Sequence, residues 1–320
     1  MKLVKYRFLF FIRKTEVIVF LYGRNGGYMS TLVGKNIVKR YGKDTVLKNV
    51  DINIETGKIY GLIGRNGAGK TTLLSILTAQ NPASEGTVTL DGKPVWENEK
   101  CLSRICYSRE ISPVTMFGPN TYRVKDYLST AKAFYVNWDE EYAKELVKLF
   151  NINIKKKINR LSKGMLSAVT IIIALASKAE ITILDEPVAG LDVVAREQFY
   201  KLVIEEYAAT GRTFIISTHI IEEAASLFEE VIMIDDGQIV VKENTEGLLS
   251  RAYRISGEET AVDAAVNDLK VYHPESIGRN KVVTVLADEP IDGFSEDVMV
   301  EPVSLQNLFY AMSVDERKEA

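Results

Sequence analysis

The chain has 320 residues, of which 46% are hydrophobic and 26% are charged, and its formal net charge is −3. These values are ordinary for a globular protein and exclude a fibrous or intrinsically disordered chain. A charge this close to zero gives no general attraction to nucleic acid or anionic lipid, but it is compatible with a local basic patch, so composition alone does not identify partners. No apolar run approaches the roughly 20 residues needed to cross a bilayer.

Residues 1–28 are basic and aromatic, and Arg13, Lys14 and Glu16 interrupt their apolar pattern. The pair Gly26-Gly27 shortly before Met29 is what a ribosome-binding sequence gives when it is translated through to a start codon. We therefore expect this N-terminal extension not to be native protein. An amphipathic helix lying on a membrane surface is the alternative.

Regular patterns begin at Met29. Residues 32–38, 50–54 and 87–90 read as strands, and residues 58–63 form an apolar strand that runs into a glycine-rich turn. A helix is predicted from Gly69 to about Ala79, with its leucines forming the buried face. Together these elements open a domain that we expect to span residues 29–248.

The character of the sequence changes at residues 113–178, where three helical patterns follow one another and predict an inserted helical subdomain. From residue 181 to 234 strands and helices alternate again, which is typical of βαβ units with a mainly parallel sheet. Residues 249–320 predict a small α+β appendage, with a strand at 281–286 and a helix at 304–312.

The glycine-rich turn fits a phosphate-binding motif: Gly64-Arg65-Asn66-Gly67-Ala68-Gly69-Lys70-Thr71, followed by Thr72. Its glycines allow backbone N–H groups to close around phosphate oxygens at the positive end of a helix. Lys70 would reach the β- and γ-phosphates, and the Thr71 hydroxyl would ligate Mg²⁺. The strand before the motif and the helix after it argue against a chance glycine turn.

Residues 181–184 are an apolar strand that ends in two acids, Asp185 and Glu186. An uninterrupted apolar strand is typical of one buried on both faces. Two carboxylates at the end of such a strand therefore indicate that they bind a cation or one specific water molecule, rather than being ordinary solvated acids of a loop. We expect Asp185 to hold Mg²⁺ and Glu186 to act as the general base on the attacking water. With the phosphate loop, this arrangement defines only a P-loop NTPase, a class that also includes kinases, GTPases and motors.

Four further segments resemble the ATP-binding cassette (ABC) ATPases, in the order found in that family. Residues 161–165 (LSKGM) resemble the family's signature sequence, Tyr41 resembles its adenine-stacking aromatic, residues 189–192 (AGLD) resemble its D-loop and His219 resembles its switch histidine. The resemblance implies a nucleotide-binding role for Tyr41, a D-loop role for Asp192 and a catalytic role for His219.

The same resemblance implies that the site is shared between two subunits. Ser162 is a good helix N-cap, so the helix after it would present N–H groups to an anion. In the family this anion is the γ-phosphate of ATP bound to the other subunit, contacted by the residues equivalent to Ser162, Lys163 and Gly164. We therefore expect a dimer with a second copy of the chain or with a homologous subunit.

Two departures from the family pattern stand out. Lys163 and Met165 replace the usual glycine and glutamine of the signature, while Ser162 and Gly164 remain. At the position of the glutamine that senses Mg²⁺, Glu110 aligns best and could contact Mg²⁺ or water.

The resemblance implies a fold class: an α/β P-loop NTPase cassette with a RecA-like core, an antiparallel β subdomain and the helical subdomain, followed by the appendage. It implies the motor subunit of a bacterial transporter, of the antibiotic- or peptide-exporter type, bound to a separate transmembrane subunit at the cytoplasmic face of the membrane. The alternative is a soluble ABC ATPase that acts on ribosomes or DNA. A single cassette without a long coiled-coil insertion favours the transporter, so no nucleic-acid partner is expected.

Overall fold

The computed structural model describes residues 30–111, 122–291 and 293–315. The predicted non-native segment 1–28 lies outside the described residues, as does the start of the predicted helical subdomain. Among the helices described, none combines the length and the apolar character needed to span a membrane.

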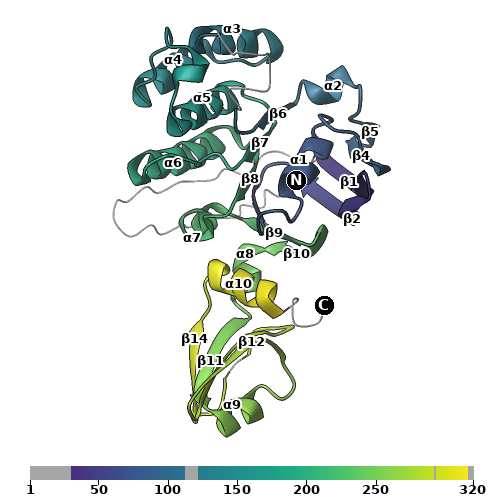
Figure 1. Ribbon diagram of the computed structural model, residues 1–320, viewed down its shortest axis with the longest axis vertical. Helices are drawn as coiled ribbons and strands as arrows, with labels where there is room; N and C mark the ends of the chain where they lie inside the picture. Colours follow the sequence, from purple (N-terminus) through teal and green to yellow (C-terminus); the bar gives the residue numbers. More distant parts are fainter. Residues whose placement is uncertain (1–29, 112–121, 292, 316–320) are drawn as a thin grey trace, which may run out of the picture.

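A six-stranded sheet forms the centre of the molecule, and five of its strands are parallel (Figure 1). Only the edge strand β10 runs antiparallel to its neighbour. In order across the sheet, the strands are β10 (Gln238–Asn244), β9 (Glu230–Asp235), β3 (Ile59–Ile63), β8 (Thr213–Thr218), β7 (Ile181–Asp185) and β6 (Ile105–Ser108). Every residue of β3, β7 and β8 is buried, which explains why their sequences are mainly apolar and do not alternate with polar residues.

An antiparallel sheet and helix α1 (Lys70–Leu77) cover one face of this central sheet. The antiparallel sheet consists of β2 (Asp44–Glu55), β1 (Thr31–Tyr41), β4 (Glu85–Leu90) and β5 (Lys93–Pro94), and α2 (Glu99–Leu102) follows it. The predicted apolar face of α1, made of Leu73, Leu74 and Leu77, is buried against it.

Helices cover the opposite face of the central sheet, on the left of Figure 1. Between β6 and β7 the chain forms α3 (Val124–Phe134), α4 (Glu140–Leu149), the short η1 (Ile158–Arg160) and α5 (Lys163–Ala176). Helix α6 (Val193–Thr210) connects β7 to β8, and α7 (Ile221–Ala224) with η2 (Ala225–Leu227) connects β8 to β9. Successive residues of a strand face opposite sides of the sheet. Ile183 therefore packs on the side of α1, whereas Leu184 packs on the side of α5 and α6.

The C-terminal part is a second, antiparallel sheet with the order β12-β13-β11-β14, at the bottom of Figure 1. Its elements are α8 (Thr245–Leu249), β11 (Ala252–Glu258), α9 (Glu259–Ala265), β12 (Lys270–Ile277), β13 (Asn280–Leu286), β14 (Val298–Pro302) and α10 (Leu305–Asp315). Helix α9 packs on one face of this sheet, and α10 contacts both β12 and α7 of the larger part. The predicted strand and helix both form here, within a sheet that the sequence patterns did not foresee.

Candidate functional site

The phosphate-binding motif forms the turn between β3 and α1, as predicted. Gly69 caps α1 with φ 107°, a left-handed conformation that favours glycine. A Cβ on Gly64 would lie 2.5 Å from the carbonyl oxygen of Ile234, so only glycine allows this close approach. Arg65, Asn66 and Gly67 are exposed at the tip of the turn, Ala68 is buried, and Thr71 and Thr72 lie in the first turn of α1.

Lys70 folds back onto the loop that carries it. Its ammonium donates to the carbonyl oxygens of Gly64 (2.7 Å) and Arg65 (3.2 Å), and its side chain is only 7% exposed. Burial lowers the pKa of Lys70, and the nearby Glu186 and Asp185 carboxylates oppose that shift. An anionic phosphate in the loop would favour the charged form in the same way.

Asp185 lies at the carboxyl end of β7, between donors from the two neighbouring strands. Ser217 of β8 donates its hydroxyl to one carboxylate oxygen (2.5 Å), and Tyr107 of β6 donates to the other (3.2 Å). Burial and the Asp185 charge raise the pKa of Tyr107, so it remains a proton donor at neutral pH. Both donors restrict the orientation of the Asp185 carboxylate.

Glu186 is held by contacts with three residues. Its backbone N–H donates to the Ser217 hydroxyl (3.0 Å) and carbonyl (3.2 Å), while its carboxylate contacts Nδ1 of His219 at 2.6 Å and Nζ of Lys70 at 3.9 Å. Its φ of 49° is left-handed, an uncommon conformation for a residue that is not glycine. Such backbone outliers concentrate at functional sites.

A cavity of about 520 Å³ joins the predicted metal-binding residues. Thr71, Asp185, Glu186 and Glu110 all line it, with Tyr107 and Gln80 beside them. Hydroxyl and carboxylate oxygens are the ligands that Mg²⁺ prefers, and Mg²⁺ commonly takes one or two carboxylates together with substrate phosphates. The donor set of this cavity therefore fits Mg²⁺ bound with a nucleotide.

The signature residues lie at the start of α5. Ser162 caps this helix and accepts from the N–H of Met165 at 3.3 Å, as its predicted N-cap role requires. A Cβ on Gly164 would lie 2.4 Å from the carbonyl oxygen of Gly190, so the glycine allows α5 to pack on the 189–190 loop. Lys163 forms an ion pair with Glu110 (3.4 Å), which links the two departures from the family pattern.

Tyr41 and Asp192 lie outside the lining of the cavity. Tyr41 ends β1 with 47% of its surface exposed, and its hydroxyl accepts from Asn81 at 2.5 Å. Asp192 caps α6 by accepting from the N–H of Ala195 at 2.8 Å. Each therefore has a local contact that is independent of any nucleotide.

Sequence reasoning missed Ser217 and Tyr107, the two donors to Asp185. Neither belongs to a recognisable motif. Their roles arise because β6 and β8 flank β7 in the sheet although they are distant from it in sequence. The only local signal for Ser217 is its position at the end of an apolar strand, two residues before His219.

Comparison with known proteins places the chain in a family. Residues 47–189 match the family described as ABC transporter. The ABC transporter ATP-binding protein YtrB of Bacillus subtilis is 26% identical over 284 residues, covering 87% of this chain and 96% of YtrB. The lantibiotic transport ATP-binding protein SrtF of Streptococcus pyogenes is 31% identical over 227 residues, covering 67% of this chain and 90% of SrtF. The chain belongs to the ATP-binding subunits of ABC transporters.

The ABC cassette fold predicted from the sequence is confirmed. The dimeric post-hydrolysis structure of the ATP-binding cassette MJ0796, with ADP and Pi, has a TM-score of 0.58 at 24% identity, covering 67% of this chain and 98% of that one. ABC ATP-binding subunits bind and hydrolyse ATP, dimerise and pair with transmembrane subunits. The predicted ATP hydrolase activity of this chain is therefore confirmed.

Proposed function

We propose that this ABC ATPase drives a bacterial exporter, as a dimer bound to separate transmembrane subunits at the cytoplasmic face of the membrane. The observation that carries the ATPase part of this proposal is the convergence of Lys70, Asp185, Glu186 and His219 beside the phosphate loop. We also propose that residues 29–248 form the ATPase domain, with the helical subdomain at about 113–178, and that residues 249–320 form an appendage.

In the proposed reaction, Glu186 takes a proton from the attacking water. Its carboxylate is suited to this because the contacts with His219 (2.6 Å) and Lys70 (3.9 Å) orient it. Lys70 would exchange the Gly64 and Arg65 carbonyls for the β- and γ-phosphates. Residues 64–69 would surround those phosphates with backbone N–H groups, and Thr72 would extend this contact into α1.

Thr71 and Asp185 would hold Mg²⁺, with Glu110 as a further oxygen ligand from across the same cavity. When bound, Mg²⁺ neutralises charge on the phosphate oxygens. Ser217 and Tyr107 keep Asp185 oriented toward that position. Glu110 can serve Mg²⁺ only by leaving Lys163, its partner in the ion pair.

The remaining residues complete the site. We propose that Tyr41 stacks on adenine and that its exposed ring supports this role. Ser162, Lys163 and Gly164 would contact the γ-phosphate held by the partner subunit, with Asp192 in the adjoining D-loop. Ser162 and Lys163 are exposed at the positive end of α5, where a partner could reach them.

A relative named for Nod factor export, 31% identical over 216 residues, supports the proposal of export. Proteins named for export and for import both occur among the relatives that are about 29% identical, so the direction needs its own experiment. Co-purification with a multi-span membrane protein encoded beside this chain would support the transporter. Co-sedimentation with ribosomes or DNA would instead indicate the soluble alternative.

The Glu186→Gln variant tests the catalytic assignment. It should bind ATP and dimerise, which light scattering can detect, but its kcat should fall by roughly 10² to 10⁴ because the positioned base is lost. Glu222→Gln, at an exposed glutamate of α7 near His219, is the control and should retain kcat. Normal turnover by Glu186→Gln, or turnover by a strict monomer, would contradict the proposal.

A further inference from the structure

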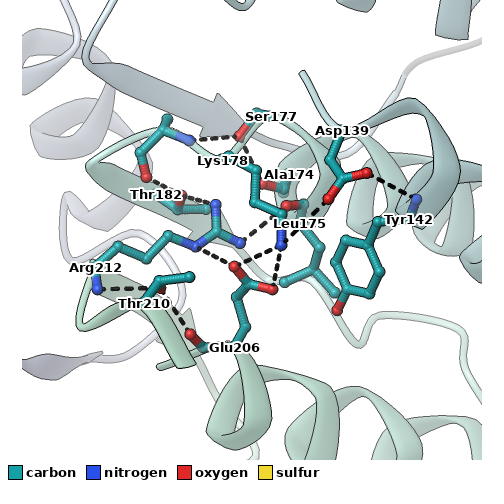
Figure 2. A network of polar contacts seen from close by, with 11 residues as sticks. Asp139, Tyr142, Ala174, Leu175, Ser177, Lys178, Thr182, Glu206, Thr210 and Arg212 are labelled. Atoms are coloured by element: carbon teal, nitrogen blue, oxygen red, sulfur yellow. Dashed lines mark hydrogen bonds and ion pairs between the residues drawn. The ribbon is translucent and has the colours of Figure 1, made fainter. Parts of the chain in front are cut away.

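Figure 2 shows a cluster of charged residues, which lies at the amino end of β7 and β8. Asp185 and His219 lie at the opposite, carboxyl end of these strands. Lys178 contacts both carboxylate oxygens of Glu206 (2.9 and 2.8 Å), and Nε of Arg212 lies 3.4 Å from the same carboxylate. The Glu206 and Arg212 side chains are each only 4% exposed. One buried carboxylate is therefore shared by two cations.

This cluster fixes the C-terminal end of α5 to the central sheet. Arg212, just before β8, donates to the carbonyl of Leu175 (3.0 Å) in the last turn of α5 and to the hydroxyl of Thr182 in β7 (3.5 Å). Glu206 belongs to α6, which packs beside α5. Cations at a helix C-terminus are favourable because the free carbonyls there carry partial negative charge.

The same cluster reaches α4. Nζ of Lys178 lies 3.9 Å from Asp139 and 4.2 Å from the ring centre of Tyr142. Asp139 caps α4 by accepting from the N–H of Tyr142, and its own N–H donates to the carbonyl of Ala176. The end of α5 is thus tied on one side to the sheet and on the other side to α4, as Figure 2 shows.

Stability alone does not explain this choice of residues. Removing charges from water is costly, and well-packed apolar residues often serve as well or better in a buried position. Burial lowers the pKa of Arg212, although a guanidinium remains charged in proteins. What directional charge-assisted hydrogen bonds provide, and apolar packing does not, is a defined geometry between the helix end and its neighbours.

Helix α5 has a second attachment near its N-terminus. Ser167 donates to the carbonyl of Ala189 (2.6 Å), and Gly164 packs against Gly190. These front contacts and the charged cluster are about ten residues apart, or ~15 Å along the helix. Two attachments define the direction of the axis, so a shift of ~2 Å at the rear would turn the helix by ~8° about the front contacts.

We propose that Lys178, Glu206 and Arg212 are positioning residues for ATP hydrolysis: they hold α5 in the direction at which Ser162 and the N–H groups after it meet the partner subunit's nucleotide. The inference rests on the proposed function of Ser162. A turn of ~8° lies within the 10–20° that productive sites tolerate, but it would move Ser162 by ~0.7 Å, which exceeds the tolerated displacement of about 0.5 Å.

The test uses the full chain with Glu186→Gln, so that ATP-bound dimers accumulate. Lys178→Met removes the charge but keeps an aliphatic chain over Tyr142, and Lys178→Arg restores the charge. Lys58→Met is a matched control, because Lys58 has the same exposure (26% against 25%) and also pairs with glutamates, Glu55 and Glu230, but it lies at β3.

Light scattering at a temperature well below every variant's Tm gives the dimer dissociation constant in ATP, and a fluorescent ATP analogue gives nucleotide affinity of the monomer. We expect Lys178→Met to weaken dimerisation about 10-fold with nucleotide affinity unchanged within about twofold, because the phosphate loop is not attached to the cluster. Lys178→Arg and Lys58→Met should dimerise like the parent.

With Glu186 intact, Lys178→Met should lower kcat about 10-fold at nearly constant KM. Arg212→Lys keeps the charge but loses the bond to Leu175, so it gives an independent measurement. It should also lower kcat about 10-fold and leave KM nearly constant. If the parent dimerises and both variants dimerise equally well, the positioning role is wrong while the proposed function stands. If the Glu186→Gln parent stays monomeric in ATP, the proposed function fails and the inference fails with it.

Discussion

Ser217 connects the two acids of the site, and its replacement by alanine is the most direct test of the geometry. The side chain is fully buried; it donates to Asp185 (2.5 Å) and accepts from the N–H of Glu186 (3.0 Å). Ser217→Ala removes one oxygen atom. It leaves Asp185 with Tyr107 as its side-chain donor among the described residues.

The expected loss of stability follows from the type of bond removed. A hydrogen bond to a charged group contributes about 1.5 to 3 kcal/mol, and ~2 kcal/mol lowers the Tm of a domain of this size by about 4 to 8 °C. The effect on function is separate. Mutation of a residue that orients a metal ligand typically lowers metal affinity or activity by about 10- to 100-fold.

Calorimetry and steady-state ATPase assays over a Mg²⁺ titration measure both effects. The Mg²⁺ concentration for half-maximal activity should rise at least about 10-fold in Ser217→Ala, because the Asp185 carboxylate is less restricted. Thr78→Val is the control, since the buried Thr78 hydroxyl donates to neutral carbonyls at the end of α1. A variant with an unchanged Mg²⁺ requirement and unchanged kcat would refute the role given to Ser217.

Three shorter predictions follow from other contacts. Gly164→Ala places a Cβ 2.4 Å from the Gly190 carbonyl oxygen, so α5 must shift; kcat in ATPase assays should fall about 10-fold or more, and a fully active variant would contradict this. Chelation of Mg²⁺ with EDTA should abolish ATPase activity, and added Mg²⁺ should restore it; activity that persists in EDTA would exclude the metal role of Thr71 and Asp185. Burial raises the pKa of Glu229 above its ordinary value of 4.5, so its ionisation destabilises the fold as pH rises through that range. Glu229→Gln should therefore raise Tm at pH near 7.5, with a gain that disappears toward pH 4.5.

The sequence predicts the part of the site that is local in the chain. The phosphate loop, the acids after β7 and the cap at Ser162 each depend on a few adjacent residues, so a linear pattern can reveal them. The contacts of Ser217 and Tyr107 with Asp185 depend on strand order, because β8 and β6 flank β7 only in the folded sheet. No local pattern specifies such a neighbour.

The pairing of buried charged residues is the second feature that the sequence does not predict. Lys178, Glu206 and Arg212 look like surface residues in the sequence, because charged residues are rarely buried unless they are paired. Their ion pairs join residues up to 28 positions apart, so no local pattern reveals them. In the appendage, β12 was not foreseen because a register shift between Tyr272 and Glu275 breaks its alternation, and His273 within it has a φ of 48°. Alternation predicts a strand only where the pairing is regular.

The left-handed backbone of Glu186 has a cost in stability that can be measured. A side chain with a Cβ in the left-handed region costs roughly 1 to 2 kcal/mol, whereas glycine adopts it without that penalty. Both Glu186→Ala and Glu186→Gly remove the contact with His219, so the difference between them isolates the backbone term. Glu186→Gly should be about 1 kcal/mol more stable to denaturant than Glu186→Ala, although neither should turn over ATP. An alanine variant as stable as the glycine variant would mean that the left-handed conformation carries no strain. The expected order would mean that the chain keeps a strained backbone at Glu186, which is consistent with the role as general base proposed for its carboxylate.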